Sequence, residues 1–264
     1  MINIIVALDC EAKPLIEYFK LKRQPDHAYP VYRTDKIQLI VSGVGKLNAA
    51  TATGYLAGVN DTPAAWVNIG IAGHKTHVLG TPCLTHKITD QQSNQSWYPI
   101  FIFKTTLATE SLGTFDAPEN NYEDELLHDM EATGFYQAAS RFNSAEFIHC
   151  LKVVSDNAEN SSREINKQMV SELIHEQIDP IANFISSLDT HLDNWNNITA
   201  TPDIYNAIIK ACHFSTYQQH QLKQLLKRWT ALRSEQNNLS ANLLRLNNSR
   251  DILKYLQDAL NITE

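Results

Sequence analysis

The sequence predicts an α/β protein with a helical extension at its carboxyl end. Residues Ile2–Leu8 form a continuous apolar run, which is typical of a central strand covered on both faces. Further strand-like runs at 37–41, 66–71 and 146–154 each end in a turn that carries glycine or acidic residues. After residue 220 the pattern changes, and leucines repeat at helical spacing to the end of the chain.

Length and charge suggest two parts. The chain has 264 residues, of which 43% are hydrophobic, enough for one large domain or one domain with an appendage. From Asp203 onward 8 basic residues stand against 5 acidic ones, whereas the rest of the chain has 14 against 24. We therefore expect an α/β domain over residues 1–198 and a helical extension over 199–264. The net charge of −7 argues against a nucleic-acid partner.

Cysteine spacing and hydropathy predict a cytoplasmic protein. The four cysteines are scattered without metal-like or redox-like spacing, so we expect reduced and mostly buried thiols. The amino terminus lacks the basic region and cleavage site of a signal peptide, and no apolar run could span a bilayer. We expect no membrane partner.

The first third of the chain predicts strand, helix, hairpin and glycine turn in order. A helix is expected over 12–20, which places Glu11 where the first strand ends; Glu11 could line a cleft there or only complement the helix amino terminus. Tyr32–Thr34 and Ile37–Val41 indicate a hairpin. The glycines of the following Ser42–Ala50 segment could form an anion or hydroxyl site, or serve packing alone.

The middle of the chain predicts further strands and a loop near Gly73. The strand over 66–71 runs into this loop, where Gly73 would allow close approach to a ligand and His74 is expected to be exposed. Pro82–Ile88 and Ile100–Lys104 are predicted as strands. Phe115, in a turn over 114–118, could cover a base or anchor the loop.

The segment 128–139 is predicted to be a tightly packed helix with Asp129 and Glu131 in its first turn. Asp156 follows the strand over 146–154 and, taken alone, is equally an ordinary turn residue. Ser162–Asn194 is predicted to be helical with a break at Pro180, followed by a junction over 199–202. Two or three amphipathic helices complete the chain, and we expect them to cover the main domain or to support a homo-oligomer such as a dimer.

Five short motifs in fixed order carry a resemblance to a known superfamily. They are Leu8–Glu11, Ser42–Ala50, Asn68–Gly73, Asp129–Ala132 and Val154–Asp156. Together they resemble the nucleoside phosphorylase/nucleosidase superfamily, and most closely the methylthioadenosine/S-adenosylhomocysteine nucleosidases. The resemblance covers about residues 1–160. It implies a three-layer α/β/α sandwich around a mixed, partly barrel-like sheet, and cleavage of the N-glycosidic bond of a purine nucleoside.

The resemblance also implies roles for individual residues. Glu11 would orient or activate the attacking water, and Asp156 would protonate N7 of the departing purine. Met130 and Glu131 would bind the ribose. The remaining substrate-binding positions that it implies are Gly73, Phe115, Asp116 and Ser155.

Loss of a purine from ribose has oxocarbenium character, as in glycoside hydrolysis, where two carboxylates divide the acid and base roles. The residue types therefore fit the reaction, and no metal or cofactor is expected. Two alternatives remain open. A phosphorylase could use the same fold, although the residues Asn68 and Ile71 stand where phosphate would need cations or hydroxyls. The chain could also be a nucleoside-binding or interaction module without turnover.

Overall fold

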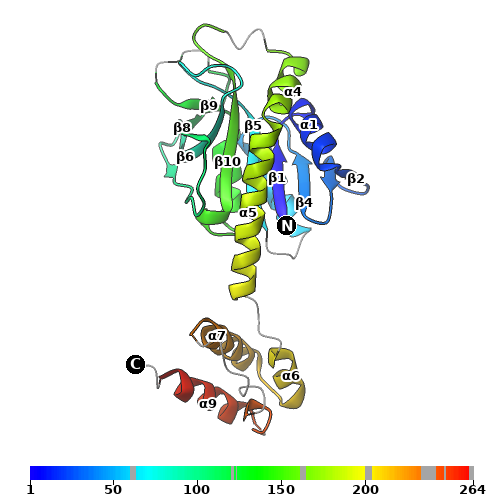
Figure 1. Cartoon of the computed structure of the whole chain (residues 1–264), viewed down its shortest axis with the longest axis vertical. Helices are drawn as coiled ribbons and strands as arrows, with labels where there is room; N and C mark the ends of the chain where they lie inside the picture. The colour runs from blue at the N-terminus through cyan, green and yellow to red at the C-terminus, as the bar shows by residue number, and fades with distance from the viewer. Residues whose placement is uncertain are drawn as a thin grey trace. The chain divides into compact units, whose positions relative to one another are not determined.

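The computed structural model describes residues 1–59, 64–119, 122, 124–160, 165–199, 204–232, 242–246 and 248–261. The chain divides into two compact units, Met1–Leu192 and Asp193–Glu264 (Figure 1). The first unit holds all the described strands and the second is helical.

The first unit is built on one ten-stranded mixed sheet, of which half closes into a barrel. In sheet order the strands are β10 (Ile148–Asp156), β6 (Pro82–Asp90), β8 (Ala108–Thr114), β9 (Leu127–Asp129), β5 (Ala65–Gly73), β1 (Ile2–Val6), β4 (Ile37–Val41), β3 (Val31–Arg33) and β2 (Lys22–Gln24), and β7 (Ser96–Trp97) pairs with β6. Because β10 also pairs with β5, the strands from β10 through β6, β8, β9 and β5 form a closed ring. The predicted barrel-like mixed sheet is confirmed.

Helices cover both faces of this sheet. Ile2, Ile4 and Val6 of β1 pack in a core with α1 (Asp9–Phe19), α4 (Lys167–Glu176) and α5 (Ile178–Thr199), which run along one face (Figure 1). Ile5, one residue out of phase, packs in a second core with α2 (Lys46–Gly58) and α3 (Ala132–Ala139). Side chains of a strand alternate between faces, so β1 contributes to both cores. The predicted three-layer α/β/α arrangement is confirmed.

One sequence-based expectation about strands differs from the structure, and one strand of the structure is not predicted. Ile100–Lys104 is not a strand, because Phe101 and Phe103 pack against the ring of His149 instead of forming a ladder. Strand β8 occupies the following segment, where polar residues hide the pattern. The predicted hairpin of β3 and β4 is confirmed.

The segment predicted to be one helix over 128–139 is divided. Its first two residues end β9, and α3 begins at Ala132. Asp129 stays close to the helix start, because its Oδ2 accepts the N–H of Ala132 at 2.8 Å. A carboxylate here satisfies an amide that the helix leaves unpaired. The buried face of α3 is the predicted one, with Phe135 and Tyr136 inside.

The helical region before the second unit breaks at Gln177, between α4 and α5. Pro180 lies in the first turn of α5, where its missing N–H costs little. Part of the predicted helix, residues 161–164, and most of the predicted junction over 199–202 lie outside the described residues.

The second unit contains α6 (Ile204–Ala211), α7 (Thr216–Leu232) and α9 (Ser249–Asn261). Their apolar faces meet in a core of their own that includes Ile208, Leu226 and Leu256. Within the described residues, no helix combines the length and apolar character that crossing a membrane requires.

Candidate active site

Strand ends of the first unit surround one cavity of about 490 Å³. β1, β5 and β10 run parallel, so their carboxyl ends lie at the same edge of the sheet, and His128 of β9 pairs with Gly73 at the end of β5. The lining consists of Ala7, Leu8, Glu11, Val44, Ile71, Ala72, Gly73, Phe115, Pro118, Glu119, His128, Asp129, Met130, Glu131, Ser155, Asp156 and Ile165. Three carboxylates far apart in sequence, Glu11, Glu131 and Asp156, thus share one cavity.

Glu11 is held rigidly by backbone amides. Its Oε2 accepts the N–H groups of Ala7 at 3.0 Å and Leu8 at 2.9 Å, and its Oε1 accepts that of Ile71 at 2.9 Å. Gly70 makes room for this side chain, since a Cβ there would lie 2.7 Å from Oε1. Burial raises the pKa of Glu11 above its ordinary value, against the lowering effect of Lys152 and the three amides. A carboxylate with a raised pKa is a better base toward water near neutral pH.

Glu131 is anchored by the glycine turn that follows β4. Its Oε1 accepts the N–H of Gly45 at 2.8 Å. Gly45 has φ of +105°, a conformation that residues with a Cβ rarely adopt, so the turn depends on glycine. Burial raises the pKa of Glu131 to about 7, and the negative charge of Asp129 adds to this, whereas Lys152 opposes it. The Ser42–Ala50 segment therefore fixes a carboxylate at the cavity.

A buried ion pair lies beneath these carboxylates. Lys152 Nζ is 2.8 Å from Asp129 Oδ2, and both side chains are almost fully buried. Burial by itself would lower the pKa of Lys152, but the carboxylates of Asp129 and Glu131 raise it above its ordinary value. Asp129 also accepts the hydroxyl of Thr114 at 2.7 Å. The cation stabilises the charge of the surrounding acids, as a buried charge requires.

Asp156 ends β10 and is the third carboxylate. Its Oδ1 accepts the hydroxyl of Ser155 at 2.5 Å, and its Oδ2 accepts the hydroxyl of Tyr122. Gly73 faces it closely, because a Cβ at this glycine would lie 2.7 Å from Asp156 Oδ2. Ser155 and Gly73 both line the cavity, and the hydroxyl of Ser155 fixes one oxygen of this carboxylate.

Asp116 lies apart from the other predicted site residues. It is not among the residues that line the cavity, whereas Phe115 and Met130 are. Its Oδ1 pairs with Lys46 Nζ at 2.6 Å, and its side chain is 54% exposed. The same ammonium pairs with Asp90. Burial would raise the pKa of Asp90, but the hydrogen bond from Lys46 and two backbone amides lower it to about 2.

The similarity of this chain to known proteins lies in its structure. No family model and no curated protein matches it. A methylthioadenosine nucleosidase from Arabidopsis thaliana matches at 17% identity and a TM-score of 0.60, over 71% of this chain and 95% of its own. The Streptococcus pneumoniae methylthioadenosine/S-adenosylhomocysteine nucleosidase, solved with a transition-state inhibitor, matches at 17% identity and 0.59, over 71% and 99%. A Chlamydia trachomatis protein of the same kind matches at 21% and 0.55, over 71% and 100%.

The fold is that of the methylthioadenosine/S-adenosylhomocysteine nucleosidases. The predicted nucleoside phosphorylase/nucleosidase fold is therefore confirmed. Two residues that contact the site's carboxylates are not predicted by the sequence motifs. Lys152 could have been found as a lone cation in an apolar strand, whereas Tyr122 had no signal, because only the folded loop brings it to Asp156.

His74 is buried on the nucleosidase fold, contrary to the expectation of an exposed loop residue. Its side chain is 2% exposed, and its Nδ1 accepts the N–H groups of Thr76 at 3.1 Å and His77 at 3.0 Å. The ring therefore closes the turn that follows Gly73, a role that sequence spacing does not indicate. Burial lowers the pKa of His74, which keeps the ring neutral.

One cluster of possible metal ligands lies behind this turn. His74, His77 and Glu110 offer ligand atoms within 4.8 Å of one another. However, both amides occupy the lone pair of His74 Nδ1, so the neutral ring carries its proton on Nε2. His77 Nε2 already pairs with Glu110 Oε1 at 3.0 Å. The donor set therefore serves the turn, and it does not present three free lone pairs to a cation.

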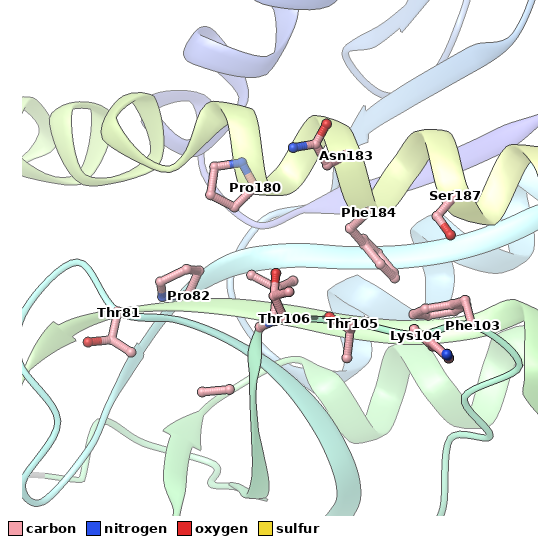
Figure 2. A pocket seen from close by; sticks show the side chains of 12 residues that line it. Thr81, Pro82, Phe103, Lys104, Thr105, Thr106, Pro180, Asn183, Phe184 and Ser187 are labelled. Atoms are coloured by element: carbon pink, nitrogen blue, oxygen red, sulfur yellow. Dashed lines mark hydrogen bonds between the residues drawn. The ribbon is translucent and has the colours of Figure 1, made fainter.

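A second cavity, of about 480 Å³, lies on the nucleosidase-like unit between α5 and residues 103–108 (Figure 2). Phe184 of α5 reaches toward Phe103 there, with ring centroids 5.5 Å apart. Lys104 is the single charged residue among those that the structure describes in its lining, and no carboxylate lies there. The cavity lacks the acid and base groups that nucleoside cleavage needs.

Proposed function

We propose that this chain is a purine nucleosidase that hydrolyses the N-glycosidic bond of an adenosine-type nucleoside such as methylthioadenosine or S-adenosylhomocysteine. The observation that carries the proposal is the convergence of Glu11, Glu131 and Asp156 on one cavity of about 490 Å³. A volume of this size falls in the range of small-molecule sites. The shared fold adds support, because the matching proteins include methylthioadenosine nucleosidases.

Glu11 acts as the base toward water. Its carboxylate is fixed by three amides, so it can hold a water molecule in one orientation without reorganising. As the bond from the ribose carbon to the base nitrogen lengthens, positive charge develops on the sugar and water attacks that carbon. Glu11 takes the proton that the water loses, in the manner of a glycosidase base.

Glu131 binds the ribose through its hydroxyl groups. Gly45 holds one oxygen of its carboxylate, so the side chain can accept a sugar hydroxyl in a fixed position. Met130 beside it provides apolar contact for the sugar. Lys152 keeps the local negative charge tolerable, since two further acids lie within the same buried region.

Asp156 serves the departing purine. A proton delivered from its carboxyl group to N7 neutralises the charge that builds on the base as the bond breaks. Ser155 orients the carboxyl group, and Gly73 lets the base approach it closely. Phe115 lines the cavity and packs against the base. Asp116 does not contact the base in this proposal, because it lies outside the cavity lining and pairs with Lys46.

Water is a better nucleophile here than phosphate. The described lining of the cavity contains neither lysine nor arginine, and Lys152 below it is paired with Asp129. A phosphate dianion without cationic partners binds weakly. The hydrolytic reaction is therefore the one that the site supports, and a phosphorylase is the competing activity on the same fold.

The experiment is release of free base from methylthioadenosine, S-adenosylhomocysteine and adenosine, with and without phosphate. We expect release in phosphate-free buffer, and a loss of about 10²–10⁴-fold in rate for Glu11→Gln and for Asp156→Asn. Asp189→Asn is the matched control, because this aspartate pairs with Lys36 on the surface.

Three results would count against the hydrolase. Strict dependence on phosphate would show a phosphorylase. Binding of nucleosides without release of base by the wild-type chain would indicate a binding module. Full activity of correctly folded Glu11→Gln and Asp156→Asn variants would remove the mechanism.

A further inference from the structure

A tyrosine lies at the end of the cavity where Asp156 stands. The hydroxyl of Tyr122 donates to Asp156 Oδ2. Its ring lies against Gly73, where an added Cβ would be 2.9 Å from Tyr122 Cε1. The ring also stacks on His128, with centroids 5.4 Å apart and an interplanar angle of 29°.

These are the contacts that a purine would make in the same place. A planar aromatic ring lies against a glycine backbone and a second ring, and a polar atom at its edge meets the carboxyl group of Asp156. Ser155 takes the other carboxyl oxygen. A purine that hydrogen-bonds to Oδ2 of Asp156 must therefore displace the hydroxyl of Tyr122.

His128 is the second ring at this end of the cavity. The side chain is 8% exposed, and neither ring nitrogen has a hydrogen-bond partner in the described residues. An unpaired buried polar group costs free energy, so a ligand that replaces the phenol and reaches this ring would gain by pairing it. Phe115 covers it from another side, at 4.9 Å between centroids.

We propose that the side chain of Tyr122 occupies the base subsite and competes with the purine for Asp156. This inference rests on the proposed function, because it takes the ligand to be a purine. The apparent affinity for the purine equals the intrinsic affinity multiplied by the fraction of molecules in which the Tyr122 side chain has left the subsite. Tyr122 thus limits which ligands bind, since a base must replace both its hydrogen bond and its stacking.

The test is the dissociation constant of adenine, measured by calorimetry. Adenine has no ribose and no glycosidic bond, so its binding reports on the base subsite alone. Tyr122→Ala, which removes the competitor, should lower the dissociation constant about tenfold. Tyr122→Phe keeps the ring but loses the hydroxyl, so it should lie between Tyr122→Ala and wild type. Tyr98→Ala is the control, because Tyr98 is 61% exposed, and it should leave the constant unchanged.

The outcomes separate this inference from the proposed function. An unchanged or higher dissociation constant in Tyr122→Ala overturns the inference, and so does a lack of adenine binding by both wild type and variant. Tighter adenine binding without nucleoside cleavage supports the inference and overturns the hydrolase. Thermal unfolding checks each variant, and if Tyr122→Ala does not fold, a lower constant in Tyr122→Phe supports the inference and an unchanged one overturns it.

Discussion

Lys152 is the residue on which the acidic site depends. Its ammonium pairs with Asp129, and its charge acts on Glu131 and Glu11 as well. Three carboxylates in one buried region would repel each other and favour their protonated forms. A single cation beside these acids offsets that repulsion, so their ionised forms remain accessible in a buried region.

Replacement of this cation should destabilise the fold strongly. Lys152→Met leaves Asp129 as an unpaired buried charge, and we expect a loss of about 3–5 kcal/mol in the free energy of unfolding. Lys36→Met breaks the exposed pair with Asp189 and should cost about 1 kcal/mol or less. Urea unfolding of both variants measures the difference; equal losses would contradict the assigned role of the buried pair.

The titration of Glu131 should appear in the pH dependence of stability. Its pKa is about 7 in the folded chain, against an ordinary value of 4.5, so the folded state holds the proton more tightly than the unfolded state. The stability that this provides is complete below about pH 4.5 and is lost as the pH rises through about 7.

Glu131→Gln removes that pH dependence. Between pH 5 and pH 8 the wild-type chain should lose on the order of 2 kcal/mol more unfolding free energy than the variant. Chemical denaturation at the two pH values gives the comparison, and parallel losses in both proteins would contradict a raised pKa.

The acidic residues could be predicted because short motifs surround them, whereas their support could not. Glu11, Glu131 and Asp156 each stand in a recognisable segment at a strand or helix boundary. The amide donors of Glu11 come partly from Ile71, 60 residues away, and only the paired strands bring them together. The pairing of Asp116 with Lys46 likewise depends on a contact between segments far apart in the sequence, the turn after β8 and the start of α2.

At the scale of elements, α2 and α3 approach each other through a glycine. A Cβ on Gly134 would lie 2.0 Å from the carbonyl oxygen of Lys46, which is backbone and cannot move aside easily. This contact also holds the start of α2 beside Glu131, which precedes α3. The glycine therefore links helix packing to the geometry of the site.

Two alanine substitutions test this contact. Gly134→Ala should destabilise the chain by about 1–3 kcal/mol, because the helices must separate. Gly54→Ala, in the interior of α2 with open space around it, should stabilise by up to about 1 kcal/mol through helix propensity. Thermal unfolding measures both. A stabilised Gly134→Ala would refute the close approach.

Strands and helices with a clear apolar pattern could be predicted from the sequence, whereas those with a weak pattern could not. Most residues of β1, β5 and β10 are buried, and so is the aromatic face of α3. Their apolar sequences therefore indicate these elements directly. Strand β8 begins with two exposed residues, Ala108 and Thr109, and the segment before it carries aromatics that pack without strand pairing. Tertiary contacts decide such segments, and a single sequence does not reveal them.

At the scale of the whole molecule, the two units have separate cores. The last buried residues of the first unit's two clusters are Val154 and Leu192, and the first buried residue of the second unit's cluster is Ile208. The predicted division at 198/199 and the division into compact units at 192/193 both fall in α5. That the second unit supports a homo-oligomer, as its sequence suggested, stays a proposal.

Removal of residues 200–264 tests whether the first unit folds by itself and whether the second unit supports a homo-oligomer. The shortened chain should keep a cooperative unfolding transition, because it retains both clusters of the first unit. If the helices join subunits, its mass in solution should fall to that of a smaller assembly, as light scattering would measure. An unchanged stable oligomer would show that the contacts between subunits lie in the first unit.

The closure of the sheet affects how the protein behaves at high concentration. A ring of strands has no free margin, so among the described strands the main strand order ends at β2, with the two-residue β7 beside β6 off this order. Strand β2 has three residues, Lys22, Arg23 and Gln24, of which the first two are exposed and cationic. A short, charged outer strand is a poor template for pairing with another chain, and this protects the protein against aggregation through backbone hydrogen bonds.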